Sequence, residues 1–204
     1  MKKITPSIVL LFLSQLLLFS QNHQLVDSLE TLLKSATQDT TKSKVLLQLC
    51  YAFIDINPDT AIIFANQSLS LSDRIGFRKG SANAFISLGE INENKGNFKQ
   101  AMELHMKALK VMEEIGNKKG ISRTLTYIGM VFQDQCNYPE ALKNLYAALK
   151  IDEELGDRQS CATALGNIGA IYFHQGNILI PQHKDRLPVF RKHLSMLMLY
   201  NNIL

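Results

Sequence analysis

The chain has 204 residues, of which 46% are hydrophobic and 20% charged, a globular composition that excludes a collagen-like or disordered chain. Its formal net charge of +4 comes from bases near the two ends, and the nearly neutral stretch between them has no clustered bases for binding nucleic acid. The absence of Trp and the low aromatic content, against many Leu, Ala and Lys residues, favour an all-α fold.

The first 20 residues have the pattern of a secretory signal peptide. Lys2 and Lys3 precede a mostly apolar run that ends at Phe19. This run is shorter than the ~20 apolar residues that a helix needs to cross a bilayer, which favours a cleaved signal over a membrane anchor. We expect cleavage after Ser20 and export to the periplasm or cell envelope. A retained anchor stays the alternative, because Leu18 is bulky for a position three residues before the cut.

Residues 21–40 are expected to form a capping helix and a linker. Five apolar residues recur at helical spacing over 24–35, which predicts an amphipathic helix suited to cover the exposed end of a helical stack. They are Leu25, Val26, Leu29, Leu32 and Leu33. Residues 35–43 are mostly polar and predict the linker that follows this helix.

A repeat with a period of 40 residues begins at Thr41. It gives complete repeats over 41–80, 81–120 and 121–160 and a partial repeat over 161–177, and the second and third repeats share nine identities. The recurring residues are Gly89, Gly129 and Gly169; Asn57, Asn97, Asn137 and Asn177; Ala61, Ala101 and Ala141; Leu69, Leu109 and Leu149; and Gly76, Gly116 and Gly156. A fixed period of this length indicates a solenoid of stacked repeats.

Each repeat is predicted to be a hairpin of two helices. In the third repeat, apolar residues follow helical spacing on both sides of a break at 136–137. Gly96, Gly116 and Gly156 are expected to end helices in the left-handed conformation. Small residues are expected where the two helices cross, because a bulky side chain there would push the axes apart. In the second repeat these small residues are Gly89, Ala101 and Ala108.

One set of residues recurs in the second, third and fourth repeats. They are Leu88-Gly89, Gly96-Asn97-Phe98, Ala101 and Ala108-Leu109; Ile128-Gly129, Phe132, Asn137-Tyr138, Ala141 and Ala148-Leu149; and Ile168-Gly169, Tyr172 and Gly176-Asn177. This pattern resembles the tetratricopeptide repeat (TPR), and the 40-residue length is similar to the units of bacterial peptide-sensing regulators and kinesin light chains. The first repeat departs from it at Leu49 and Ser68. The resemblance implies an all-α solenoid, a right-handed superhelical stack of antiparallel helix hairpins.

Residues 178–204 do not continue the repeat. Pro181 and Pro188 stand where the second helix should have Ala, and two prolines interrupt a continuous helix. The abrupt loss of pattern motivates the hypothesis that the gene is frameshifted or truncated near codon 177 and that this divergent tail is out-of-frame sequence. A naturally divergent tail is the alternative.

No catalytic, metal or cofactor site is predicted. The five histidines do not pair with Cys or acidic residues at ligand spacing, and we interpret them as surface or helix-edge residues. Cys50, Cys136 and Cys161 have no CxxC spacing and are interpreted as small buried residues rather than a disulfide framework. We therefore expect no enzyme activity and no cofactor.

By resemblance, a TPR array holds its ligand in a concave groove lined by the first helix of each hairpin. The residues implied for this groove are Asn83, Glu90 and Asn94 in the second repeat, Arg123, Tyr127 and Met130 in the third, and Asn167, Phe173 and His174 in the fourth. Asn167 matches an Asn that bonds the backbone of a bound peptide in many relatives. The basic clamp with which chaperone adaptors hold a carboxylate is missing. A merely solvated face is the alternative interpretation of these residues.

These features favour a scaffold in the cell envelope that binds a protein or peptide and no nucleic acid. As an alternative, a signal peptide followed by 40-residue repeats resembles the sensory region of bacterial receptor adenylate cyclases and histidine kinases, of which the chain would be a truncated piece. Self-association through an uncapped last repeat is also expected, because Leu165, Ile168 and Tyr172 would be exposed unless the tail covers them.

Overall fold

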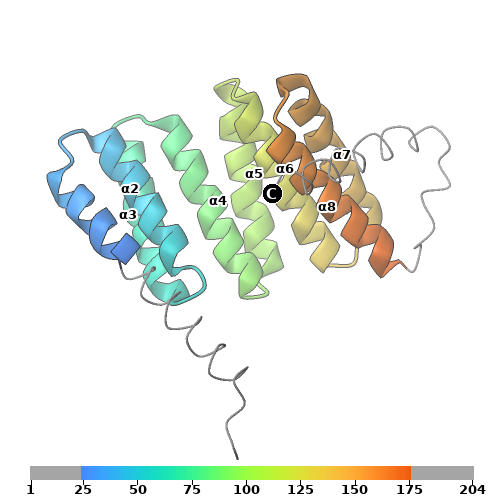
Figure 1. Cartoon of the computed structure of the whole chain (residues 1–204), viewed down its shortest axis with the longest axis horizontal. Coiled ribbons are helices and arrows are strands. Elements are labelled where there is room, and N and C mark those ends of the chain that lie inside the picture. The colour runs from blue at the N-terminus through green and yellow to red at the C-terminus, as the bar shows by residue number, and fades with distance from the viewer. Residues whose placement is uncertain (1–23, 176–204) are drawn as a thin grey trace, which may run out of the picture. The chain divides into compact units, whose positions relative to one another are not determined.

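The structure is a computed structural model, and it describes residues 24–175 (Figure 1). Every regular element in this stretch is a helix, which confirms the predicted all-α fold. The chain divides into two compact units, one that ends at Ile91 and one that begins at Asn92. The expected signal peptide (1–20), the turn at Gly176-Asn177 and the divergent tail (178–204) lie outside the described residues.

The first compact unit contains a helix over 24–35, α2 (Asp39–Phe53), α3 (Pro58–Arg74) and most of α4 (Arg78–Asn94). The helix over 24–35 is the one that the sequence predicts, and its Leu29 packs with Val45 and Leu49 of α2. α2 and α3 pack against each other as a hairpin.

Three buried serines join α2 to α3. Ser43 Oγ lies 3.0 Å from Ser68 Oγ and 2.6 Å from Ser72 Oγ. Ser68 Oγ also donates to the backbone oxygen of Ser43 at 2.9 Å. A hydroxyl can be buried when its hydrogen bonds are satisfied, so the Ser at position 68 is accommodated where the repeat otherwise has Ala.

The second compact unit contains the last turn of α4, α5 (Phe98–Glu114), α6 (Lys118–Asp134), α7 (Tyr138–Leu155) and α8 (Arg158–His174). From α5 to α8 each helix packs on the next, and α6 also contacts α8. The helices from α3 to α8 begin at intervals of 20 residues, so each 40-residue repeat consists of two equally spaced helices.

The crossing of α6 and α7 confirms the predicted role of the small residues. A Cβ atom built on Gly129 would lie 2.8 Å from Leu145 Cγ and 3.3 Å from the backbone oxygen of Ala141. Ala141 is fully buried on the facing helix, as are Ala101 and Ala108 in the second repeat. The two helices therefore approach so closely that no side chain fits at position 129.

The contact between α7 and α8 corrects one expectation. Leu165 and Ile168 are not exposed at the end of the array; both are buried in a cluster with Leu145 and Leu149 of α7. Tyr172 is half-buried, and its hydroxyl oxygen lies 3.4 Å from that of Tyr146. The reason is helical geometry, since these side chains lie on the face of α8 that packs on the preceding hairpin.

Within residues 24–175, five helix ends have the same two hydrogen bonds, those of a Schellman motif. At the end of α6, for example, the amide of Cys136 donates to the oxygen of Gln133 and the amide of Asn137 to that of Phe132. The motif requires a left-handed residue, which is Gly at 76, 96, 116 and 156 but Cys at 136, with φ 58°. The predicted left-handed glycines at 96, 116 and 156 are thereby confirmed.

Replacing Cys136 with Gly is expected to stabilise the protein by about 1 kcal/mol, because a side chain in the left-handed region clashes with the backbone. Thermal unfolding followed by circular dichroism should show a melting temperature higher by about 2–4 °C. Gln135→Gly is the matched control, since Gln135 has φ −78° and gains nothing from glycine. Equal effects of the two changes would show that Cys136 is not strained.

Candidate functional site

Five of the residues predicted for the groove lie on two neighbouring helices of the second compact unit. Successive residues of an α-helix are rotated by about 100° around its axis. Arg123, Tyr127 and Met130 therefore fall within about 60° of one another around α6. Asn167 and His174 lie on the equivalent face of α8, and α6 and α8 are in contact. None of the five side chains is buried. We call these residues, with Asp134 described below, the α6–α8 face.

Phe173 lies on a different side of α8. It is turned about 100° from His174 and follows Gly169 by one helical turn. Its side chain is 69% exposed, and its ring meets the His174 ring edge-on with centroids 6.1 Å apart. The structure therefore places Phe173 beside the α6–α8 face rather than within it.

The three predicted residues of α4 fall on both sides of the boundary between the compact units. Asn83 and Glu90 are half-buried in the first unit, and Asn94 is exposed in the second. They occupy the repeat positions of Arg123, Met130 and Asp134.

Asp134 belongs to the α6–α8 face, although the sequence analysis did not select it. It is the repeat equivalent of Asn94 and His174, both of which are predicted groove residues. The alignment of the 40-residue repeats therefore identifies Asp134 as well. Burial raises the pKa of its carboxyl group. With Arg123 it gives the face one basic and one acidic side chain, separated by about 16 Å along α6 at 1.5 Å per residue.

His105 is the second residue that the sequence analysis missed. The interpretation of His105 as a surface or helix-edge residue is wrong, because its side chain is fully buried on α5. It occupies the repeat position of Leu145, which is also fully buried, so the register again carried the signal. Its Nε2 lies 3.9 Å from Glu93 Oε2, and neither ring nitrogen has a hydrogen-bond partner within residues 24–175.

The ring of Tyr127 packs on the buried ring of His105. The two rings stack with centroids 5.3 Å apart and an angle of 18° between their planes. Stacking against a fully buried ring restricts the Tyr127 side chain to few orientations. Tyr127 remains half-buried, so the α6–α8 face contains one aromatic ring held in place before any ligand binds.

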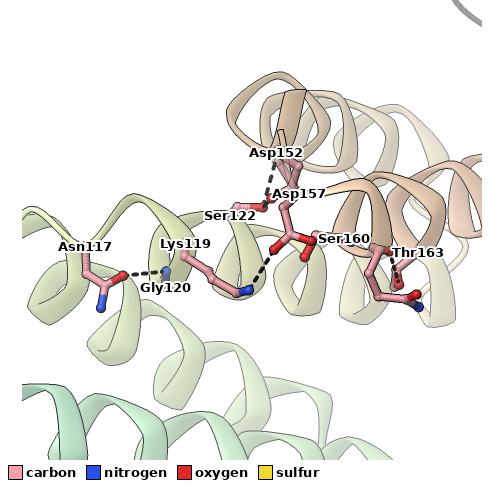
Figure 2. A network of polar contacts seen from close by, with 10 residues as sticks. Asn117, Lys119, Gly120, Ser122, Asp152, Asp157, Ser160 and Thr163 are labelled. Atoms are coloured by element: carbon pink, nitrogen blue, oxygen red, sulfur yellow. Dashed lines mark hydrogen bonds and ion pairs between the residues drawn. The ribbon is translucent and has the colours of Figure 1, made fainter. Parts of the chain in front are cut away.

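Polar contacts at the N-terminal end of α6 hold this helix against α7 and α8 (Figure 2). Lys119 Nζ lies 2.7 Å from Asp157 Oδ2, and Asp157 Oδ1 accepts the amide of Ser160 to cap α8. Lys119 and this cap lower the pKa of the Asp157 carboxyl group. Ser122 Oγ donates to Asp152 Oδ1 of α7 at 2.5 Å. Lys119 and Ser122 thus join α6 to the two following helices through side chains outside the α6–α8 face.

Asp152 differs from Asp157 because it is buried. Its side chain is 1% exposed, and burial raises the pKa of its carboxyl group although the hydrogen bond from Ser122 partly opposes this. Its Oδ2 has no hydrogen-bond partner in the described residues. The Ser122–Asp152 pair is therefore a buried polar contact that depends on a single donor.

Residues 24–175 contain no disulfide, no helix able to span a membrane and no group of three metal-ligating side chains. The three cysteines are free thiols; Cys50 and Cys161 are buried as expected, whereas Cys136 is exposed. No helix in this stretch has the length and apolarity needed to span a membrane. No three His, Cys, Asp or Glu side chains of the same stretch are grouped to hold a metal ion.

Comparison with known proteins finds similarity to tetratricopeptide repeats in part of the chain. Residues 120–178 match the family described as tetratricopeptide repeat. Tetratricopeptide repeat protein 29 of Trypanosoma brucei brucei is 28% identical over 94 residues, which are 46% of this chain and 20% of that protein. The chain thus spans about a fifth of the length of this curated relative.

Solved structures establish the TPR solenoid fold. A Rap protein complexed with competence and sporulation factor superposes with a TM-score of 0.73 at 15% identity, over 87% of this chain and 50% of that one. A signal transduction ATPase with numerous domains and a tetratricopeptide repeat sensor, from Pyrococcus horikoshii, superposes with a TM-score of 0.62 at 16% identity, over 79% of this chain and 26% of that one.

Proposed function

We propose that this TPR scaffold binds a peptide or protein segment on the α6–α8 face, and that it does so in the cell envelope. The observation that carries the proposal is the α6–α8 face itself, where amide, aromatic, basic and acidic side chains share neighbouring helices. Asn167 has both donor and acceptor groups and so can bond a peptide backbone, as Asn does by resemblance in many TPR proteins. The Rap protein complexed with competence and sporulation factor supports the binding of a ligand by this fold.

The position of the face in a preorganised scaffold favours binding over mere solvation. Tyr127 is already stacked on His105, and Lys119 and Ser122 already hold α6 against α8 and α7. Ordering these groups therefore costs little at the moment of binding. The envelope location rests on the signal-peptide pattern of residues 1–20.

The test uses a library of random dodecapeptides displayed on phage and selected on the purified full chain. For the selected peptides, we expect Asn167→Ala or Arg123→Ala to weaken binding at least about 10-fold, a loss of about 1.4 kcal/mol measured by isothermal titration calorimetry. Gln100→Ala removes an exposed amide from α5 and is the matched control, which should leave the affinity unchanged. Selected peptides that bind all three variants equally well would place the binding site elsewhere.

A sensory region of a larger signalling enzyme is the second candidate. The Pyrococcus horikoshii ATPase supports it, because there a tetratricopeptide repeat sensor is part of a longer chain. The genomic sequence beyond codon 204 distinguishes the two candidates. A frame that restores the repeat and continues into a membrane helix and a cyclase or kinase domain would favour the sensor, and its absence would favour the free-standing scaffold.

A further inference from the structure

A buried carboxyl group and a buried imidazole lie next to Tyr127 in the second compact unit. The side chain of Glu93, in the last turn of α4, is 6% exposed, and that of His105, on α5, is 0% exposed. Glu93 Oε2 and both ring nitrogens of His105 have no hydrogen-bond partner within residues 24–175. Buried polar atoms without partners are rare in folded proteins, so three of them in one place require an explanation.

The packing of the helices does not require this pair. Glu93 and His105 occupy repeat positions that have uncharged residues in the neighbouring repeats. At the position of His105, Ala65 and Leu145 are both fully buried, so an apolar side chain serves there as well. The equivalents of the pair are Phe53 and Ala65 in the first repeat and Gln133 and Leu145 in the third.

The geometry of the two groups is that of an ion pair not yet closed. Glu93 Oε2 lies 3.9 Å from His105 Nε2, which is outside hydrogen-bond range. Imidazole is the side chain that ordinarily changes its charge between about pH 5 and 8. A proton on His105 gives the two groups opposite charges. Because a charge-assisted hydrogen bond is about 2.8 Å long, closing the pair moves the two groups about 1 Å closer together.

The same proton strengthens the contact between His105 and Tyr127. The two rings are stacked with centroids 5.3 Å apart and an angle of 18° between their planes. A cation that faces an aromatic ring at this distance attracts it, by about 0.5–1 kcal/mol at an exposed site and more at a buried one. Tyr127 is thus bound more firmly to a charged His105 than to an uncharged one.

The charged groups of the two neighbouring helices show where the proton acts. On α4, Glu90 stands one helical turn before Glu93, and on α6, Arg123 stands one turn before Tyr127. Within the described residues, however, His105 makes its ion-pair and ring contacts with Glu93 and Tyr127. A proton on His105 therefore acts first on these two side chains.

We propose that Glu93 and His105 form a proton-operated switch that positions Tyr127 on the α6–α8 face. The three unpartnered atoms are inaccessible to solvent, which suits a proton rather than a larger ligand. When His105 is uncharged, ring stacking alone holds Tyr127. When His105 is charged, it pairs with Glu93 and holds Tyr127 more firmly. The effect of the switch on ligand binding rests on the function proposed above, whereas the response of Tyr127 itself does not.

Nuclear magnetic resonance of the full chain, with ¹³C in its tyrosine rings, tests this response without a ligand. The Tyr127 signal is the one missing from Tyr127→Phe, and it should move between about pH 7.5 and 5.5. His105→Leu should abolish this movement and Glu93→Gln should reduce it, and both changes introduce the residue of the third repeat. Asp134→Asn and His174→Asn, which remove a carboxyl group and an imidazole from the α6–α8 face, should preserve it. A signal that does not move, that moves equally in either of the first two variants, or that stops moving in either of the last two would overturn the proposal.

The consequence for binding is measured with selected peptides that have an amidated C-terminus and contain no His, Asp or Glu. Their affinity for the full chain should be about 5-fold higher at pH 5.5 than at pH 7.5, the ratio that corresponds to about 1 kcal/mol of cation–π attraction. His105→Leu should bind them equally at both pH values, and an equal pH dependence in this variant would overturn the coupling. A Tyr127 signal that responds to pH while the affinity does not would confirm the switch and place the peptide away from Tyr127.

Discussion

Ala141→Leu is expected to lower the free energy of unfolding by about 3 kcal/mol, at the upper end of the cost of overpacking a core. Ala141 is fully buried on α7, and its backbone oxygen lies 3.3 Å from where a Cβ atom on Gly129 would be. Three additional carbons at this crossing must separate α6 from α7. Because these two helices also contact α5 and α8, the second compact unit should lose its packing as a whole.

The matched control is Ala147→Leu on the same helix, where the side chain is exposed and leucine is a good helix former. Thermal unfolding should show a melting temperature about 6–12 °C lower for Ala141→Leu and little change for Ala147→Leu. Two similar melting curves would show that the crossing of α6 and α7 is not where the structure places it.

Ser122→Ala is expected to lower the free energy of unfolding by about 2 kcal/mol at neutral pH, since it leaves the buried carboxylate of Asp152 without its donor. The double variant Ser122→Ala/Asp152→Met should recover this loss, because an apolar pair of suitable size can replace a buried polar pair. In the second repeat the residues at the equivalent positions are Ala82 and Met112, and each of these side chains is buried.

The pH dependence of Ser122→Ala has a defined sign. Burial raises the pKa of Asp152, so the folded protein binds this proton more tightly than the unfolded chain. This group therefore destabilises the fold as pH rises from its unfolded pKa of about 3.9 through the raised folded value. The deficit of Ser122→Ala should accordingly shrink between pH 7 and pH 4, as measured by urea unfolding.

Asp157→Asn is the counterpart with the opposite sign. Lys119 and the Ser160 amide lower the pKa of Asp157, so the stability that this carboxylate contributes is present at neutral pH and is lost as pH falls through the lowered value. The difference in free energy of unfolding between the original chain and Asp157→Asn should therefore vanish in acid.

The loss of stability caused by Ser122→Ala should, by contrast, depend on pH through Asp152. A loss that is constant with pH would show that Asp152 is not the group left without a donor.

Much of the fold was predictable because the same local sequence pattern recurs in each repeat. The period of 40 residues, the helix ends at Gly96, Gly116 and Gly156 and the close crossing at Gly129 all follow from local conformation and side-chain size. Less of the candidate site was predictable, since helical period alone puts Arg123 and Tyr127 on one side of α6, whereas the nearness of Asn167 depends on the packing of α8.

The missed residues are those whose surroundings come from another helix. Composition alone places His105 at the surface because histidine is usually partly exposed, whereas the repeat register puts it in the position of the buried Leu145. For Leu165 and Ile168, the expectation of exposure is wrong because nothing local distinguishes the side of α8 that packs on α7 from its other sides. In both cases the burial of the side chain depends on a neighbouring helix and not on the adjacent sequence.

The sequence by itself thus determined the helices, their ends and the all-α repeat, because these depend on residues close together in the chain. Only the tertiary structure decided that Ser122 bonds Asp152, that Tyr127 stacks on His105 and that Leu165 packs on α7. These contacts join residues up to 30 positions apart. Their existence depends on the angle and distance at which whole helices pack, which no local pattern encodes.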